Sequence, residues 1–425
     1  MVVAPIASGR EAGLRDLLGT MSSTPGAVDP LNAVLPFGRF GRLHFARLVV
    51  LDDTTMGDLE ACCLPRPRVP TYLAFIGDCD GPLRDFLSEL CARAGEGLRA
   101  LFSHCEGYDA GADLLSWLLE RNVRPSANYV NWIGRTVLQV RQENALQRAL
   151  SSKAPRDALA AGGDPQQIRR DLVAFAASEV RAGRLALTPP EPTPLGWWLA
   201  NLLHAIAVPV AGLVALPFLI VLSPLLVYLL RARETGDPEM VARPAARALR
   251  DLQQLEDHDV TNQFTAMGPV KPGLFRRGVL IVALTGLDYA CRHVYNRGYL
   301  TRVQTIHFAS WTFIDDKTRL VFASNYDGSL ESYMDDFINK VAWGLNLVFS
   351  NGFGYPRTDW LVKGGARREL KFKYFLRRHE LPTQVWYKAY PGLTGVDIAR
   401  NKRIREGLDR AQMTDAEALD WLRLL

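Results

Sequence analysis

The residues with the strongest capacity for chemistry lie in one short polar segment, residues 255–264. Three carboxylates flank a histidine there, and the four residues are Glu256, Asp257, His258 and Asp259. A carboxylate beside an imidazole can fix the tautomer of the ring and raise its pKa, which suits a general base or a ligand. The alternative is a solvated loop or helix end. We take His258 and Asp259 as candidate catalytic residues. We predict no metal site, because no second histidine or cysteine stands at a zinc-ligand spacing.

Two Asp-Gly pairs, Asp80-Gly81 and Asp327-Gly328, form a second group of candidates. Each pair falls where a predicted strand gives way to a predicted helix. An aspartate at such a junction can cap the helix and meet the positive end of its dipole. It could instead line a pocket at the end of a sheet, together with Asn325. Asp80 and Asp327 are therefore candidate catalytic residues, and Asn325 is a candidate cofactor-binding residue.

The two Asp-Gly pairs belong to an internal duplication. Residues 319–355 align without a gap within residues 71–108, and the matches extend from Phe75 and Phe322 to the Gly-Tyr pairs at the ends. So many identities at one offset indicate two copies of one unit. Upstream, residues 43–50 and 306–314 are predicted strands, with His44 and His307 at the same place. A core histidine is the default interpretation. If the two sheets face each other, both rings could reach one cavity, so His307 is a candidate cofactor-binding residue.

The order of elements in each copy predicts the fold class. Strand, strand, helix, connector, helix and strand is the order expected of a ferredoxin-like α+β unit, an antiparallel sheet with helices on one face. Two such sheets can cover each other, so we expect two ferredoxin-like repeats packed as an intrachain α+β barrel. The predicted organisation is a flexible lead-in (1–40), repeat 1 (41–150), an inserted helical region (151–300), and repeat 2 with a C-terminal tail (301–425).

The inserted region contains a long apolar segment. Residues 192–230 include no Asp, Glu, Lys or Arg, with Trp197-Trp198 at one end and Arg231 and Arg233 beyond the other. Aromatic and basic borders of this kind are typical of membrane segments. A single spanning helix would separate the two copies, and three prolines interrupt the run. We therefore predict a hydrophobic membrane hairpin at 195–230 that enters and leaves on one side. A buried soluble hairpin is the alternative.

The composition of the chain limits its expected cellular location and binding partners. The net charge of +5 is mild and does not indicate nucleic-acid binding. Six cysteines form no CxxC pair, which favours reduced thiols, and the N-terminus does not resemble a cleaved signal peptide. We expect a membrane-associated protein with the bulk of its chain in the cytoplasm. The expected partners are the lipid bilayer and an apolar small molecule or lipid.

One short motif resembles a known family. Residues 77–81, GDCDG, match the GxxDG pattern of dye-decolorizing peroxidases, and the repeats resemble the dimeric α+β barrel superfamily to which those enzymes belong. In that family the aspartate serves on the distal side of haem. The resemblance implies that Asp80 or Asp327 would handle peroxide protons. It also implies that a histidine, His258, His307 or His379, would bind haem.

Two further candidates lie near the C-terminus. His379 ends a basic helix and could be an axial haem ligand, although a favourable charge at a helix C-terminus is the simpler interpretation. Tyr387 lies in an aromatic strand predicted to form a sheet face or to line a pocket, and is a candidate cofactor-binding residue. Segments 325–329, 354–358 and 383–387 resemble a group of bacterial membrane-associated proteins, and this resemblance implies no established reaction.

The sequence therefore supports two functional hypotheses from different classes. One is a membrane-associated, peroxidase-like oxidoreductase that acts on an apolar or lipid-like substrate. The alternative is a non-enzymatic, membrane-anchored protein that binds a lipid or a partner. A lipid hydrolase or lyase acting through His258 is a third reading, but the sequence offers no recognisable nucleophile, glycine-rich phosphate loop or HExxH motif.

Overall fold

The computed structural model describes residues 1–24, 26–154, 163–240 and 242–425. The chain divides into two units. Unit 1 contains residues 1–133 and 194–389, and unit 2 contains residues 134–193 and 390–425. All of the candidate site residues named above lie in unit 1.

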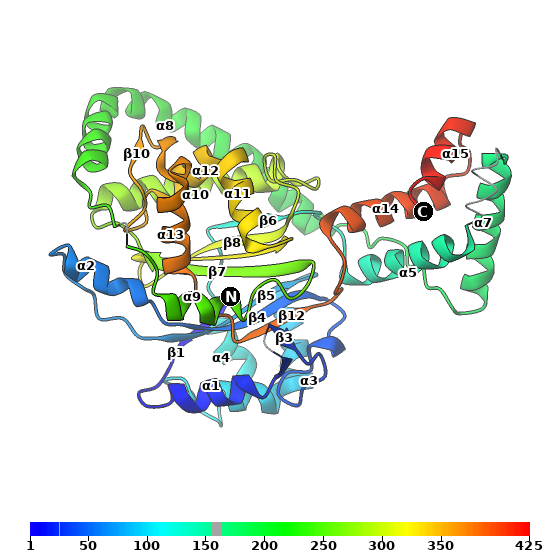
Figure 1. Ribbon diagram of the computed structural model, residues 1–425, viewed down its shortest axis with the longest axis horizontal. Coiled ribbons are helices and arrows are strands. Elements are labelled where there is room, and N and C mark those ends of the chain that lie inside the picture. The colour runs from blue at the N-terminus through cyan, green and yellow to red at the C-terminus, as the bar shows by residue number, and fades with distance from the viewer. Residues whose placement is uncertain (25, 155–162, 241) are drawn as a thin grey trace. The chain divides into compact units, whose positions relative to one another are not determined.

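Unit 1 contains two antiparallel four-stranded sheets (Figure 1). The first sheet has the order β1-β5-β4-β12, with β1 (Val2–Pro5), β4 (Leu43–Leu51), β5 (Tyr72–Cys79) and β12 (Val385–Lys388). The second has the order β6-β8-β9-β7, with β6 (Ala127–Val130), β7 (Thr261–Pro269), β8 (Ile306–Ile314) and β9 (Arg319–Asp327). The predicted strands at 43–50 and 306–314 are confirmed as β4 and β8.

Each sheet takes its fourth strand from the other half of the chain. β12, near the C-terminus, pairs with β4, and β6, from the N-terminal half, pairs with β8. Val385 lies opposite Leu48, and Ala127 lies opposite Trp311, which occupies the place of Leu48 in the second copy. The two exchanges therefore have the same register, so neither half can complete its sheet without the other.

The two sheets pack face to face. Val49 and Ile76 of the first sheet belong to one buried cluster with Met267 and Val321 of the second. The expected α+β class with antiparallel sheets is confirmed, but the expected closed barrel is wrong. No strand pairing among the described residues joins one sheet to the other, and three of the four edge strands, β1, β6 and β12, have only four residues each. A barrel needs a hydrogen-bonded neighbour on both sides of every strand.

Helices cover the outer faces of the sheets (Figure 1). The helices α1 (Glu11–Gly19), α3 (Leu83–Phe102) and α4 (Leu114–Glu120) lie on the first sheet's side, and α10 (Leu274–His293), α11 (Leu330–Lys340), α12 (Ala342–Phe349) and α13 (Glu369–His379) lie on the second sheet's side. Apolar residues spaced three and four apart from Leu330 to Val348 form a buried stripe on these helices. The helix is nevertheless interrupted at Val341, whose φ of −137° separates α11 from α12.

The first 40 residues differ from the expected flexible lead-in. They contain β1, α1 and the short strands β2 (Ser22–Thr24) and β3 (Ala27–Val28). Leu35 and Phe37 are fully buried. The alternating burial of residues 2–5 fits them to the edge of the first sheet, where β1 pairs with β5. Glycine and proline content alone obscured this short pattern.

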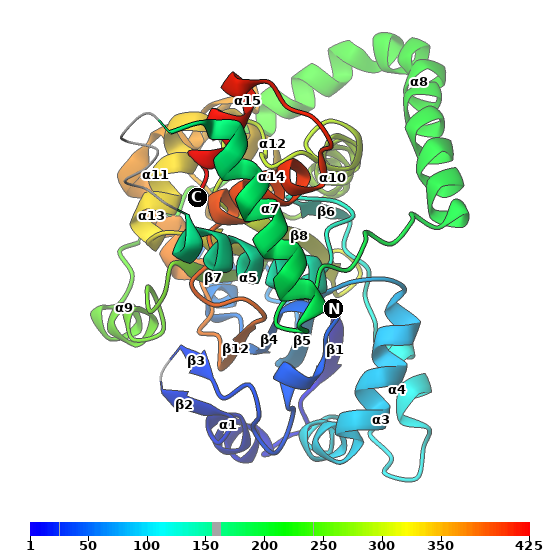
Figure 2. The ribbon, with the colours of Figure 1, turned by 90° about the vertical axis from the view of Figure 1, so that its right-hand side faces the viewer.

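The apolar segment forms one helix, α8 (Leu195–Gly236), with Pro209, Pro217 and Pro224 inside it. The predicted hairpin of two short helices is therefore wrong in its local structure. A proline removes one backbone hydrogen bond, which bends a helix without ending it when neighbouring turns continue. Figure 2 shows α8 as a bent arch that stands away from the rest of unit 1. Among the described helices, α8 alone is long and apolar enough to cross a membrane.

Both ends of α8 are attached to unit 1. Near its start, His204 Nδ1 lies 2.9 Å from Nε2 of His293, in α10. Near its end, Glu234 is buried against the hairpin formed by β10 (Thr358–Asp359) and β11 (Lys363–Gly364). The middle of α8 is exposed and apolar. Since both ends of the helix contact the same unit, the two sheets lie on the same side of it.

Unit 2 is helical. It contains α5 (Val137–Lys153), α7 (Pro165–Arg181), α14 (Gly395–Asp409) and α15 (Asp415–Leu422), which bury Leu146, Leu172, Ile404 and Trp421 in one core. α5 and α14 each begin with a capping box, formed by Thr136 with Gln139 and by Thr394 with Asp397. These reciprocal hydrogen bonds satisfy backbone N–H groups that an uncapped helix would leave exposed.

Candidate functional site

A histidine–aspartate pair occurs at the same place in both copies. His44 Nε2 lies 2.9 Å from Asp80 Oδ1, and His307 Nε2 lies 2.7 Å from Asp327 Oδ1. A carboxylate oxygen can only accept, so Nε2 of each ring donates the hydrogen bond. Thr261 also donates its hydroxyl to Asp327, at 3.1 Å. The sequence identified all four paired residues separately but did not predict that they pair.

Local backbone geometry creates these pairs. The register of β4 with β5 shifts between Leu43 and Phe45, and that of β8 with β9 shifts between Ile306 and Phe308. Each shift is a bulge centred on the histidine, and a bulge re-aims the side chain it carries. The N-cap position of the helix that follows each aspartate is occupied by another residue. Ser329 caps α11, and the residue before α3 is a proline that makes no side-chain cap.

Aromatic rings separate the two pairs. The ring of His44 lies 5.3 Å from that of Phe308, and the ring of Phe45 lies 5.5 Å from that of His307. Phe45 and Phe308 contact each other edge to face, with their centroids 5.7 Å apart. Phe45 and Phe308 follow the two histidines in the duplicated strands. The duplication therefore places two His–Asp pairs around a shared aromatic contact between the sheets.

A buried arginine links the two sheets beside this contact. Arg47 donates to the carbonyl of Phe264 at 2.8 Å, to Thr265 Oγ1 at 2.8 Å and to the carbonyl of Ser324 at 3.0 Å. It also donates to Asn325 Oδ1. Burial lowers the pKa of Arg47 to about 10, and Asp78 opposes this shift. The guanidinium remains charged at neutral pH and joins the two sheets.

Asp78 provides the nearby negative charge. Its Oδ2 accepts a hydrogen bond of 2.9 Å from Nδ2 of Asn325, so the predicted site residue Asn325 bridges Asp78 and Arg47. Burial raises the pKa of Asp78, against the opposing charges of Arg47 and His44. The sequence analysis missed Arg47 and Asp78. A basic residue inside the apolar strand 43–50 was the available signal for Arg47.

The segment around His258 does not form the expected catalytic cluster. His258 is exposed, and its Nε2 donates to the backbone carbonyl of Gln254, at 2.7 Å, instead of to a neighbouring carboxylate. Asp259 pairs with Lys388, whose Nζ lies 2.5 Å from Oδ2. Asp257 accepts from the backbone N–H of Leu330. Consecutive residues point to different partners because the segment is a turn before β7.

His379 and Tyr387 also lie apart from the two pairs. His379 is buried at the end of α13, where Nδ1 lies 2.8 Å from the carbonyl of Phe375. Burial lowers the pKa of His379, which keeps the ring neutral at neutral pH. Tyr387 stacks on Phe37 at 5.2 Å, whereas its neighbour Trp386 faces Phe45. Alternation along β12 therefore directs Tyr387 away from the opposing sheet.

A large apolar cavity lies on the other face of the second sheet. Its volume is about 730 Å³, and its walls come from α8, α10, α12 and the outer faces of β8 and β9. Leu226, Leu287, Trp311, Phe322 and Leu345 are among the lining residues, nearly all of which are apolar. This volume is within the usual range for small-molecule sites. The sequence predicted an apolar ligand but did not locate its cavity.

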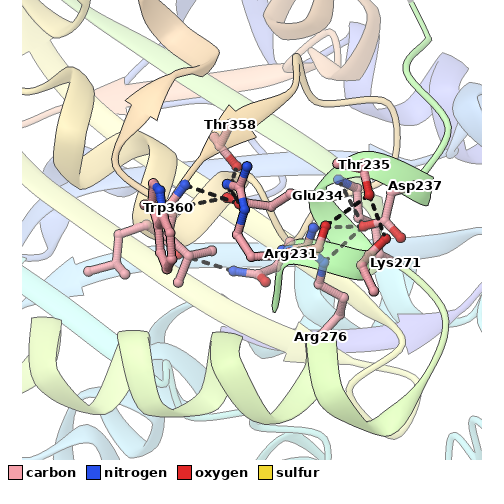
Figure 3. Close-up of polar contacts among 12 residues, drawn as sticks. Arg231, Glu234, Thr235, Asp237, Lys271, Arg276, Thr358 and Trp360 are labelled. Atoms are coloured by element: carbon pink, nitrogen blue, oxygen red, sulfur yellow. Dashed lines mark hydrogen bonds and ion pairs between the residues drawn. The ribbon is translucent and has the colours of Figure 1, made fainter. Parts of the chain in front are cut away.

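Two carboxylates hold the end of α8 next to this cavity (Figure 3). Glu234 accepts hydrogen bonds from Thr358 Oγ1 at 3.0 Å and from the backbone N–H groups of Trp360 and Leu361, at 3.0 and 2.7 Å. Asp237 accepts from Arg276 at 2.7 Å and lies 3.4 Å from Nζ of Lys271. Burial, followed by the charge of Arg276, lowers the pKa of Lys271 to about 8.

The described residues fit haem poorly. The walls of the 730 Å³ cavity include no histidine, cysteine or methionine, so among the axial-ligand types of haem they offer a tyrosine alone, Tyr295. His379 borders a second cavity of only about 40 Å³. His307 is buried between the sheets, hydrogen-bonded to Asp327. Haem binding and the peroxidase resemblance stay predictions from the sequence.

Comparisons with known proteins add no functional assignment. No protein-family model, curated protein or solved structure matches this chain. The geometry of the site is therefore the basis for assigning a function.

Proposed function

We propose that this is a membrane-associated protein that binds a lipid or another molecule with an acyl-like apolar chain. The binding site is the 730 Å³ cavity between α8, α10, α12 and the second sheet. The observation that carries this proposal is the apolar lining of a cavity one of whose walls is α8, the candidate membrane helix. Removing apolar surface from water drives such binding, at roughly 25 cal/mol per Å² buried.

The arched form of α8 supports binding to one face of a bilayer. Its two ends are attached to unit 1, whereas its middle exposes large apolar side chains such as Leu213, Phe218 and Val221. An apolar helix bent in this way can insert its middle into the bilayer while both of its ends stay on the same side. The sheets then remain together in the cytoplasm. We further interpret the two sheets as a pair of ferredoxin-like repeats that exchanged their last strands.

A cavity-filling substitution tests the proposal. Gly286 lines the cavity, and a Cβ placed there meets no atom within 4 Å. Gly286→Phe is therefore expected to fold while occupying space that the ligand needs. The matched control is Gly95→Phe in α3, where a Cβ also meets nothing within 4 Å.

The measurement is mass spectrometry of lipids that remain with the detergent-purified protein, together with titration of a fluorescent fatty acid. The wild type and Gly95→Phe should retain ligand, and Gly286→Phe should bind it at least several-fold more weakly. Equal binding by all three proteins, or no binding by the wild type, would contradict the proposed cavity.

The two His–Asp pairs favour a second candidate, the membrane-associated peroxidase-like oxidoreductase. An imidazole held by a carboxylate is suited to proton transfer. The test is the ultraviolet–visible spectrum of the purified protein with added haem, followed by peroxide turnover with His307→Leu. A Soret band that shifts in this variant would support this candidate. The absence of any band would remove it.

A further inference from the structure

The hairpin between β10 and β11 has an unusual tip. Trp360 and Leu361 adopt φ values of 54° and 60°, in the left-handed region. Bulky residues with a Cβ rarely occupy this region, which asparagine and glycine tolerate better. Two consecutive bulky apolar residues at such a turn therefore disfavour the hairpin locally. Strained positions of this kind are retained where a surrounding structure or a function requires them.

Glu234 supplies the surrounding structure. Its buried carboxylate accepts hydrogen bonds from the backbone N–H groups of Trp360 and Leu361, and so fixes the tip of the hairpin to the end of α8 (Figure 3). The three side chains of the tip are thereby directed to different places. Leu361 lines the 730 Å³ cavity, whereas Trp360 and Val362 are 48% and 38% exposed. The hairpin tip consequently lies at the mouth of the cavity.

Other exposed apolar residues share this position. Leu274, Val282 and Trp343 also line the cavity, and they are 84%, 73% and 49% exposed. With Trp360 and Val362 they form an apolar rim around the cavity mouth. A rim of large, exposed apolar side chains is typical of a surface that another apolar phase covers.

Cations lie beside this rim. Arg233, Lys363 and Arg367 are exposed, and no ion pair involving them occurs in the part of the chain that the structure describes. Residues 357–373 contain six basic and two acidic residues, a net charge of +4. Arg368, Lys371 and Lys373 of this segment are paired with carboxylates, whereas Lys363 and Arg367 are not paired among the described residues, so these two cations and Arg233 carry the charge argument. Acidic lipid headgroups are complementary to an apolar rim with basic neighbours.

We propose that the β10–β11 hairpin is an interfacial anchor that docks the cavity mouth on an anionic bilayer. Trp360 and Val362 enter the headgroup region, where tryptophan is favoured, and Arg233, Lys363 and Arg367 contact the phosphates. Glu234 holds the tip so that Leu361 closes the cavity wall as the rim meets the lipid. The inference rests on the proposed membrane association and adds the element and the lipid class that it recognises.

The test is flotation of the full-length protein with vesicles of phosphatidylcholine alone or with added phosphatidylglycerol. The anchor variant is Trp360→Asn with Val362→Thr, which leaves Leu361 in the cavity wall and suits the left-handed backbone. Its matched control in unit 2 is Leu138→Asn with Val396→Thr, since both of these residues are also exposed. The anchor variant should lose binding to both vesicle types several-fold while its unfolding temperature does not fall. The control should bind as the wild type does.

A second variant tests the charge preference. Arg233→Gln, Lys363→Gln and Arg367→Gln together should weaken binding to the anionic vesicles by about fivefold per cation at low salt, and leave binding to phosphatidylcholine unchanged. The control replaces Arg68, Arg181 and Arg403, three exposed arginines elsewhere, by glutamine.

Three outcomes would overturn the inference. In the first, the anchor variant is folded and floats with vesicles as well as the wild type does. In the second, the charge variant and its control lose the same amount of vesicle binding, and in the third, the wild type binds a protein partner but no vesicles. The anchor variant should still bind a soluble fluorescent fatty acid, because the cavity lining is unchanged. If the wild type did not bind the fatty acid, the proposed cavity function would be refuted instead. Failure of the anchor and failure of the cavity therefore give different results.

Discussion

His307 Nε2 donates a hydrogen bond of 2.7 Å to Asp327 Oδ1, across a β-bulge that recurs at His44 in the other copy. The two pairs differ in their exposure. The Asp327 side chain is 8% exposed, and that of Asp80 is 19% exposed. The same contact therefore lies in a drier environment in the second copy, where water replaces a lost partner less readily.

This difference predicts unequal costs for removing the two rings. His307→Leu should lower the free energy of unfolding by roughly 1–3 kcal/mol, because the Asp327 carboxylate loses a buried donor. His44→Leu should cost less, since water reaches Asp80. Denaturant unfolding of both variants in the same detergent measures the difference. An equal or larger loss for His44→Leu would contradict the burial argument.

Fatty-acid binding by the same variants separates structure from function. Phe322 faces the cavity, whereas its neighbours Val321 and Ala323 face the first sheet. The His–Asp pairs therefore lie on the opposite face of the second sheet from the cavity. Both folded variants should bind ligand like the wild type. A specific loss of ligand in His307→Leu would indicate that the ligand reaches the space between the sheets.

Lys271 predicts a pH dependence of stability. Its pKa of about 8 lies below its ordinary value of 10.5, because burial disfavours the charged form. Between these two values the unfolded chain binds more protons than the folded chain, so the Lys271 contribution to stability rises with pH across that interval. The full rise is about 3 kcal/mol.

The check is denaturant unfolding at pH 7.5 and at pH 10, comparing the wild type with Lys271→Met. The wild type should gain more stability on going to pH 10 than the variant does, because the variant has no amine to deprotonate. The same pH response in both proteins would show that Lys271 remains charged against Asp237.

Glu234 predicts a coupled loss of stability and hairpin order. Its carboxylate accepts from Thr358 and from two backbone N–H groups, and its side chain is 1% exposed. Glu234→Gln keeps the size but replaces one acceptor oxygen by a donor that faces other donors. The expected loss is roughly 1.5–3 kcal/mol, the range for hydrogen bonds to charged groups.

Proteolysis reports on the hairpin directly. In Glu234→Gln, cleavage after Lys363 by trypsin should become faster relative to cleavage elsewhere. Glu239→Gln is the control, because Glu239 lies near the same helix end but contacts Lys371 and the backbone N–H of Arg357, before the hairpin, instead of its tip. Equal acceleration in the two variants would contradict a specific role for Glu234.

The position of Trp311 leads us to expect that the ligand carries a polar oxygen atom. Its side chain lines the cavity, and in the described part of the chain its buried Nε1 has no hydrogen-bond partner. A ligand oxygen would satisfy this donor once a small rotation of the ring brings Nε1 to the cavity surface. Trp311→Phe should weaken the binding of a fatty acid or fatty ketone by about fivefold, the equivalent of a net hydrogen bond near 1 kcal/mol.

A hydrocarbon of the same length is the comparison, and its affinity should change little. Trp343→Phe is the matched control, because Trp343 also lines the cavity but is half exposed. Equal losses for the oxygen-bearing and hydrocarbon ligands would show that Trp311 contributes shape alone.

Several parts of the fold were predictable because they depend on local pattern. The strands at 43–50 and 306–314, the buried stripe from Leu330 to Val348, and the long apolar segment all follow from spacing and composition. The hairpin prediction for 195–230 failed because prolines in an apolar helix bend it when the ends are attached elsewhere. The prediction of a barrel was wrong because the sequence does not reveal how short the edge strands are.

The candidate site was also predictable only in part from the sequence. The duplication placed His44 with His307 and Asp80 with Asp327, but it could not show that each histidine binds the aspartate of its own copy. His258 appeared strongest because four titratable residues are adjacent in sequence. In the structure the turn directs them to Gln254, Lys388 and Leu330. Adjacency in a turn does not make a site.

The sequence by itself determined that this chain contains two related α+β halves and one long apolar segment between them. These properties reside in residue order and hydrophobic period. Only the tertiary structure decided that each half contributes a strand to the sheet of the other half. It also decided that a β-bulge directs His307 toward Asp327, and that α8 covers an apolar cavity. Those contacts join residues far apart in the chain, such as Glu234 with Leu361, and the hydrogen bonds offset the cost of burying the Glu234 carboxylate.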